Sequence, residues 1–222
     1  MNVLKVYKRL RKHFGHRHWW PGDTPFEVMV GAILTQNTAW TNVEKAIANI
    51  KAADALNPQR LLAMSDARLG RLLRPSGYFR IKTKRLKSFL RFYEGAFHSS
   101  VATMRRVGLP LLRERLLGVN GIGPETADSI LLYALNKPVF VVDAYTKRIF
   151  SRLGCINADM DYHAVQNYFV ANLPTEVRLY NDYHAQIVQL GKEMCRKSSP
   201  RCAICPLKDM CGYAAKGLRI NS

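Results

Sequence analysis

Four of the five cysteines of this 222-residue chain lie close together near its C-terminus, and no other feature restricts the fold as strongly. Cys195, Cys202, Cys205 and Cys211 have the spacing C-x6-C-x2-C-x5-C, and Pro206 follows the third of them. Thiols this close together in a loop-rich segment of a reduced protein indicate a metal centre more readily than disulfides. We therefore expect these residues to form a loop that is pinned by a bound group.

The spacing also bears on which group is bound. Zinc and iron–sulfur clusters both accept four thiolates, so the ligand type does not choose between them. Zinc sites typically use two close pairs, whereas only Cys202 and Cys205 are close here. This asymmetry favours a cluster. Basic residues between the ligands, Arg201 among them, would then face outward, which favours a role in DNA docking, although a redox role stays open.

The charge of the chain indicates a polyanionic partner. Lys and Arg number 34 against 16 Asp and Glu, a net charge of +18, and nucleic acid is the first candidate. Nine basic and no acidic residues lie within 67–93, Lys82 and Lys84 among them. We interpret this run as a phosphate-facing surface, with a solvated helix face as the alternative. A membrane surface fits less well, because the basic residues surround a turn at Gly77 instead of bordering an apolar helix face.

Apolar residues recur with helical periodicity and convincing strand patterns are scarce, so we expect an all-α fold. Thr24, Asn57 and Ser65 are expected helix N-caps. The longest apolar stretch begins at Phe26 and falls well short of the roughly 20 residues that cross a bilayer. The basic N-terminus lacks the apolar region and cleavage site of a secretory signal, so we expect a cytoplasmic protein with no membrane partner. Periodic runs lie at 26–33, 43–50, 61–73 and 130–135.

A glycine-rich turn, Gly121-Ile122-Gly123, lies between two helical stretches. Glycine permits close backbone approach, and successive amides at the start of the next helix can hold a phosphate without a charged side chain. A single G-x-G is a weak signal. The helix–turn–helix context, the apolar Ile122 and the charge of +18 nevertheless favour phosphate binding over an ordinary helix connection.

Asp143 directly follows an apolar run, Val139 to Val142. It is a good N-cap for a helix that begins near Ala144, because Asp is favoured at that position. It is also a candidate active-site carboxylate. The two roles can coexist.

Together, the G-I-G hairpin, the Val-Asp pair before the next helix and the cysteine tail resemble the endonuclease III superfamily of helix-hairpin-helix DNA glycosylases. The resemblance covers nearly the whole chain, and the cysteine spacing matches that family's 4Fe-4S loop without a gap. The segment around Gln36 is similar to the helix that fills the hole left by an extruded nucleotide. Gly77-Tyr78 followed by two lysines also matches. The resemblance implies a 4Fe-4S cofactor and, as partner, duplex DNA containing damaged bases; we expect a monomer.

The architecture that the resemblance implies is two helical modules with the active site in the cleft between them. Residues 26–137 would form a helical barrel ending in the hairpin. Residues 1–25 and 138–222 would form the second module, which carries Asp143 and the cluster loop at 195–211. The residues expected to contact DNA are Gln36, Lys82, Lys84, Gly121, Gly123, Thr126 and Arg201.

The chain departs from the superfamily at the hairpin. Bifunctional members carry a lysine two residues after the second glycine, which attacks the sugar and forms a Schiff base. Glu125 stands there in this chain, and Lys137 and Lys147 are out of register. A carboxylate cannot form an imine, so we predict a monofunctional glycosylase whose AP lyase activity is weak or absent.

Within the superfamily, Trp19-Trp20-Pro21 and the segment ending in Trp40 are similar to the 3-methyladenine glycosylase branch. Alkylated purines carry positive charge, and stacking on indole adds a cation–π contribution of about 0.5–2 kcal/mol. The candidate base pocket is formed by Trp19, Trp20, Trp40, Tyr145 and Glu125. Core packing is the alternative role of the tryptophans. Asp143 would stabilise the oxocarbenium-like transition state, or position water, after the base is flipped out.

The sequence leaves two other functions and two further substrates open. One is a bifunctional glycosylase and AP lyase for oxidised pyrimidines, against which Glu125 counts. Another is a noncatalytic iron–sulfur module that binds DNA or senses redox state, against which Asp143 counts. Mismatched thymine, or adenine opposite oxidised guanine, are further possible substrates. His184 is interpreted as a structural hydrogen-bonding residue.

Overall fold

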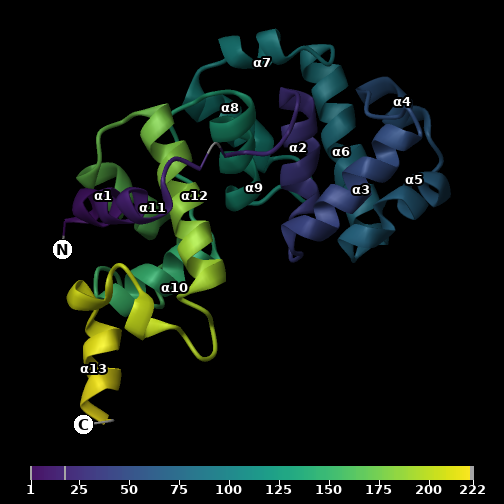
Figure 1. The fold of residues 1–222 in the computed structure, drawn as a ribbon. Helices are drawn as coiled ribbons and strands as arrows, with labels where there is room; N and C mark the ends of the chain where they lie inside the picture. The colour runs from purple at the N-terminus through teal and green to yellow at the C-terminus, as the bar shows by residue number, and fades with distance from the viewer. Residues whose placement is uncertain (1, 18, 221–222) are drawn as a thin grey trace. The chain divides into compact units, whose positions relative to one another are not determined.

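The computed structural model describes residues 2–17 and 19–220, with side chains as far as residue 216. Every regular element in these residues is a helix and none is a strand, which confirms the predicted all-α class. None of the described helices has the length and apolar character needed to cross a membrane. The chain separates into two compact units (Figure 1). We call Pro21–Lys137 the middle unit, and Met1–Trp20 with Pro138–Ser222 the terminal unit.

The middle unit is built around α2, whose residues 26–34 are all buried. Apart from Glu27, whose buried carboxylate pairs with Lys51 at 2.8 Å, the helix is apolar on every side and belongs in a core, and it contacts α3, α6, α9 and η2. The unit begins at Pro21, five residues before the boundary predicted at 26. Its helices are α2 (Pro25–Leu34), α3 (Trp40–Ala52), α4 (Pro58–Ala63), α5 (Asp66–Leu73), η1 (Arg74–Ser76), α6 (Phe79–Phe97), α7 (Val101–Arg106), α8 (Leu109–Leu117), α9 (Pro124–Ser129) and η2 (Ile130–Ala134).

The predicted N-caps of this unit are confirmed. The Thr24 hydroxyl accepts a hydrogen bond from the Glu27 amide at 3.1 Å, and Asn57 accepts from two amides in the first turn of α4. Ser65 accepts from the Arg68 amide at 3.3 Å. The last cap also explains a difference from the sequence pattern. The periodic run at 61–73 forms two helices, because the backbone is extended at Ser65, whose side chain caps α5.

In the terminal unit, α12 packs against both α1 and α10. Its core is aromatic: the rings of Phe140 and Phe169 stack with centroids 4.2 Å apart, and Phe150 meets Phe169 edge-on at 4.6 Å. The helices are α1 (Val3–Phe14), α10 (Ala144–Leu153), α11 (Tyr162–Asn172), α12 (Val177–Glu193), η3 (Cys202–Ile204), η4 (Lys208–Met210) and α13 (Gly212–Ile220).

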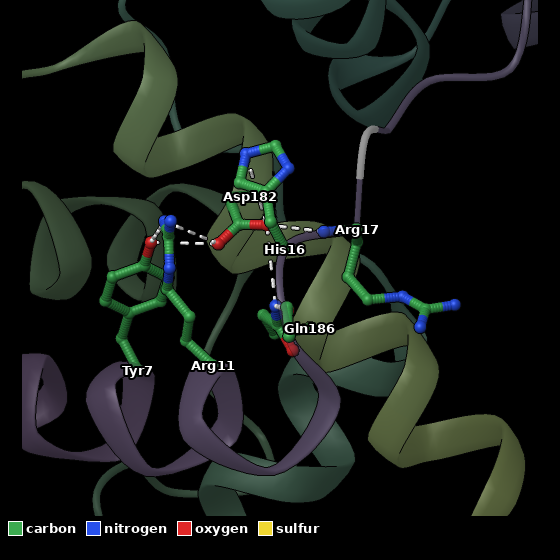
Figure 2. A network of polar contacts seen from close by, with 7 residues as sticks. Tyr7, Arg11, His16, Arg17, Asp182 and Gln186 are labelled. Atoms are coloured by element: carbon green, nitrogen blue, oxygen red, sulfur yellow. Dashed lines mark hydrogen bonds and ion pairs between the residues drawn. The ribbon is translucent and has the colours of Figure 1, made fainter.

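A buried carboxylate fixes the N-terminal segment to α12. Asp182 is 2% exposed and accepts hydrogen bonds from the Tyr7 hydroxyl at 2.9 Å and from Arg11 at 3.3 Å (Figure 2). It also accepts from the backbone amide of Arg17 at 3.1 Å. Gln186, one turn further along α12, donates to the same carboxylate at 3.4 Å. The chain leading to the first two tryptophans is thereby held along α12.

Candidate active site and nucleic-acid interface

The hairpin between α8 and α9 requires glycine at position 121. Its φ is +87°, and a Cβ there would lie 2.2 Å from the Cγ of Arg85. Since side chains avoid positive φ and the aliphatic part of Arg85 fills the space, another residue would displace the arginine. Ile122 is buried, as expected of a residue that fills the turn. Gly123 is exposed at the N-cap of α9.

Three of the residues expected to contact DNA lie together at this hairpin. The Gln36 side-chain amide donates to the Gly121 carbonyl at 2.9 Å and to the Thr126 hydroxyl at 3.0 Å. Arg85 donates to the Gln36 side-chain oxygen at 2.5 Å. The hydrogen-bond donor and acceptor of Gln36 are therefore aligned by the protein before any ligand is present. Arg85 was part of the basic run at 67–93 in the sequence, but nothing there distinguished it from its neighbours.

A buried ion pair joins the two helices of the hairpin. Asp128 on α9 is fully buried, and Arg113 on α8 binds its two carboxylate oxygens at 2.7 and 3.1 Å. A two-point contact between guanidinium and carboxylate fixes direction as well as distance. Breaking it would leave a buried charge without compensation, which is strongly destabilising. The pair therefore sets the angle at which α9 leaves the turn.

Lys82 corrects the sequence analysis. It was expected on the DNA surface, but it is 1% exposed, and its ammonium donates to the carbonyls of Leu34 at 2.8 Å and Ser76 at 2.6 Å. Burial, with a smaller contribution from the charge of Arg85, lowers the pKa of Lys82 to about 8. Because it ties the end of α2 to the turn before α6, it is not available to a phosphate. Lys84 is exposed, so it stays a candidate for DNA contact.

Next to that turn lies Tyr78, which the sequence identified as part of the Gly77-Tyr78 match but not as a residue that contacts DNA. Tyr78 is 70% exposed and has a φ of +46° between Gly77 and the start of α6. An exposed ring on a basic surface is suited to stacking on a nucleobase. The sequence signal was an aromatic residue directly after a glycine within the basic run.

Asp143 lies at the N-terminus of α10 in the terminal unit. One carboxylate oxygen, Oδ1, accepts from the Thr146 amide at 2.7 Å and from its hydroxyl at 2.8 Å, which confirms the predicted N-cap. The other, Oδ2, lies 3.5 Å from Nε2 of His184. Burial alone raises the pKa of this carboxyl, but the charge and hydrogen bond of His184 and the Thr146 donors outweigh it, so the pKa of Asp143 lies below its ordinary value. The carboxylate is therefore ionised at neutral pH.

Several candidate pocket residues surround the end of α12. The Tyr145 ring packs where Gly191 has no side chain, since a Cβ there would lie 2.2 Å from the ring. The rings of Trp19 and Trp20 meet edge to face with centroids 5.7 Å apart. The ammonium of Lys192 lies 5.6 Å from the centre of the Trp19 ring. Consecutive residues of one helix therefore touch both Tyr145 and Trp19.

The other two candidate pocket residues belong to the middle unit. Trp40 is half-buried at the start of α3, and its indole nitrogen donates to Glu44 at 2.8 Å. Glu125 is exposed in the first turn of α9, where a carboxylate is stabilised by the helix dipole.

The four clustered cysteines line one cavity, which Arg201 also borders. Arg152 of α10 donates to the sulfur of Cys195 at 3.3 Å and to the carbonyl of Arg196 at 2.6 Å, so it anchors the loop. Burial raises the pKa of the Cys202 and Cys205 thiols, and binding as thiolates therefore needs a compensating positive centre. Within the described part of the chain, no three His, Cys, Asp or Glu side chains meet as ligands of a single metal ion. The donor set itself, four thiols around one cavity, fits an iron–sulfur cluster, whose thiolates bind different iron atoms.

The chain resembles proteins of known family over most of its length. Residues 30–175 match the model of the HhH-GPD superfamily of base excision DNA repair proteins. A protein of Methanocaldococcus jannaschii, provisionally named a DNA repair glycosylase, is 47% identical over 210 residues, which are 94% of this chain and 95% of the relative.

Two solved structures are similar. The 3-methyladenine DNA glycosylase MagIII of H. pylori, bound to 1,N6-ethenoadenine, is 30% identical with a TM-score of 0.77, and the match covers 87% of this chain and 98% of that one. A non-covalent complex of endonuclease III with DNA has a TM-score of 0.85 at 21% identity, covering 98% and 97% of the two chains. The second match bears on the fold alone.

Proposed function

Because the chain belongs to the HhH-GPD superfamily of base excision DNA repair proteins, we propose that this DNA glycosylase removes alkylated purines of the 3-methyladenine type from duplex DNA by hydrolysis. It leaves an abasic site and does not cut the strand. One observation carries the proposal: the ionised Asp143 is present, while the hairpin position that would supply an attacking amine holds the exposed carboxylate of Glu125.

The substrate is proposed from the chemistry of the base. N-alkylated purines carry positive charge and leave readily as neutral bases, so their removal needs no strong general acid. Trp20 is the indole that we propose to meet such a cation, with a gain of about 0.5–2 kcal/mol over a neutral base, because the ammonium of Lys192 already lies over the Trp19 ring. The 30% identity to a 3-methyladenine glycosylase over most of both chains supports the same substrate class.

Residues of the middle unit hold the DNA while the target nucleotide is flipped out. The target nucleotide is flipped out of the duplex at a cost of a few kcal/mol, which is smallest for a damaged pair. Backbone amides at the start of α9 hold a phosphate, and Gln36, whose amide is bound to the hairpin through Gly121 and Thr126, lies beside the space that the nucleotide leaves. The exposed Tyr78 stacks on a neighbouring base.

Asp143 then acts on the sugar. The N-glycosidic bond breaks, its electron pair leaves with the base, and the positive charge that develops on the sugar is stabilised by the carboxylate. Water adds to the anomeric carbon and its proton is released. The product is an abasic site in an intact strand.

We also propose that Cys195, Cys202, Cys205 and Cys211 hold a 4Fe-4S cluster. When bound, such a cluster would cross-link the loop and keep its basic residues facing outward. The exposed Arg201 borders the cavity that the cysteines line and is placed to meet a phosphate.

The proposal is tested by identifying the bases that the protein releases. Purified holo-protein is incubated with methylated duplex and, separately, with duplex containing oxidised pyrimidines, and free bases are measured by mass spectrometry. We expect methylpurines from the first substrate and nothing above background from the second. Asp143→Asn should abolish release while binding of an abasic duplex persists. Release of oxidised pyrimidines, together with a protein–DNA adduct trapped by borohydride, would establish the bifunctional alternative instead.

The pocket is tested by comparing two substrates. Trp20→Ala should reduce release of a cationic alkylpurine more than it reduces binding of an abasic duplex, because the indole acts on the base. Equal losses in both would place this tryptophan in the core and outside the pocket.

A further inference from the structure

A buried histidine faces the candidate catalytic carboxylate. α10 and α12 pack against each other, and this packing brings Nε2 of His184 within 3.5 Å of Oδ2 of Asp143. The two side chains are only 6% and 10% exposed. The distance suits an ion pair and is longer than an optimal N–H···O hydrogen bond, as contacts in catalytic sites often are before the substrate binds. The histidine belongs to a rigid helix and not to a mobile loop.

The two oxygens of Asp143 have different surroundings. Oδ1 already accepts two hydrogen bonds from Thr146, so it serves the helix cap. Oδ2 faces His184. Since a carboxylate offers about four acceptor positions, Oδ2 retains room for a water molecule or for the developing charge on the sugar. Oδ2 is thus the carboxylate oxygen that can still interact with water or with the sugar, and His184 is the side chain that faces it.

The part of α12 that carries His184 is held in place by the two residues before it. The neighbouring Tyr183 donates its hydroxyl proton to the Val3 carbonyl at 2.7 Å, and Asp182 holds the N-terminal segment through the network of Figure 2. α12 is thereby clamped to α1 just where the imidazole leaves the helix. A residue on a helix that is held in this way can orient a partner, because its backbone position is fixed.

We propose that His184 is a positioning residue for Asp143, holding Oδ2 toward the reacting sugar and keeping the carboxylate ionised while it is buried. This inference rests on the proposed role of Asp143 in base removal. The structure supports it in a way that the sequence did not, since a lone histidine in the pattern around 184 suggested only a structural role. A purely structural histidine would leave the ionisation of Asp143 unchanged.

The direction of the effect follows from the groups around Asp143. Burial raises its pKa, and His184 and the Thr146 donors lower it. Other polar groups nearby are engaged elsewhere: Lys147 donates to the Met160 carbonyl, Arg148 to the Gly191 and Cys195 carbonyls, and the Tyr162 hydroxyl lies against the Val142 amide. Removing His184 therefore raises the pKa of Asp143. Because activity requires the ionised form, the acidic limb of the pH–rate profile moves to higher pH.

The test compares His184→Gln with a matched control, His13→Gln. Glutamine keeps a donor of similar reach but never carries a charge, while His13 is exposed in the last turn of α1, in the same unit. Single-turnover release of methylpurine is measured across pH. We expect the acidic limb of His184→Gln to lie at higher pH than in the wild type, with unchanged affinity for abasic duplex. The control should keep the wild-type profile.

A second readout needs no activity. In protein labelled with carboxyl ¹³C aspartate, Asp143 is assigned by its loss in Asp143→Asn, and its titration is followed by NMR in wild type and in His184→Gln. A titration at higher pH in the variant supports the pairing, and an unchanged titration overturns it. If wild type releases no base, the proposed function fails while the titration still decides the inference. If the glutamine variant does not fold, as judged by circular dichroism, His184→Asn takes its place in both measurements.

Discussion

Lys82 offers the sharpest physical prediction, because the sequence predicted it on the DNA surface and the structure has it buried in the core. Its ammonium is bound to the carbonyls of Leu34 and Ser76, and its pKa is about 8 against an ordinary 10.5. The perturbation is Lys82→Met, which keeps the length and apolar stem of the side chain and removes the charge. The exposed Lys84 provides the control variant, Lys84→Met.

The magnitude follows from proton linkage. Between pH 8 and pH 10.5 the unfolded chain binds more protons at this lysine than the folded protein does, so stability rises with pH. Each tenfold difference in proton affinity corresponds to about 1.4 kcal/mol, which gives about 3 kcal/mol over the whole window. At neutral pH the two hydrogen bonds are offset by the cost of burying a charge. The stability difference between wild type and Lys82→Met should therefore grow in favour of wild type as the pH rises.

The assay is urea unfolding of wild type, Lys82→Met and Lys84→Met at several pH values from 7.5 to 10. Groups that titrate in every variant cancel in the difference. We expect wild type to gain about 2–3 kcal/mol over Lys82→Met in this range, while Lys84→Met reports the effect of removing an exposed lysine from the same helix. DNA binding gives an independent check, since losing a phosphate contact reduces the salt slope by about 1. A reduced slope for Lys82→Met, with a pH-independent stability difference, would refute the buried role of Lys82.

Three further predictions concern the hairpin, the pocket and the cysteine loop. Gly191→Ala places a Cβ 2.2 Å from the Tyr145 ring, so it should cost about 1–3 kcal/mol in urea unfolding and slow base release more than it weakens DNA binding. Gln36→Ala should weaken binding of abasic duplex more than of undamaged duplex in fluorescence anisotropy, because it removes the hydrogen bonds to Gly121 and Thr126 and the side chain proposed to fill the space of an extruded nucleotide. Cys202→Ser should contain less iron than the wild type in elemental analysis, and its visible absorbance should be lost. Zinc without iron in the wild type would contradict the assignment of an iron–sulfur cluster.

Features set by neighbouring residues could be predicted from the sequence. The N-caps at Thr24, Asn57 and Asp143 depend on a side chain and amides two or three positions away, and all three are present. The all-α class followed from periodicity of the same short range. The family also followed from local motifs, because the hairpin and the cysteine tail are each continuous in the chain.

Features that depend on tertiary packing could not be predicted. Lys82 lies within a run of basic residues, and its burial appears only when the end of α2, 48 residues earlier, supplies a carbonyl. The contact between His184 and Asp143 likewise requires α10 to pack on α12. Arg85 differs from neighbouring basic residues because its stem fills the space beside Gly121. In each case the chemistry of the side chain was visible in the sequence, but its partner was distant.

The central claim is that base removal is hydrolytic and needs no amine. Its most direct test is to incubate holo-protein with methylated duplex and to score strand breaks before and after hot alkali. If removal is hydrolytic, methylpurine is released and breaks appear only after alkali, and neither is seen with Asp143→Asn. Breaks that form before alkali, in step with base release, would show an attacking amine in this chain and contradict hydrolysis.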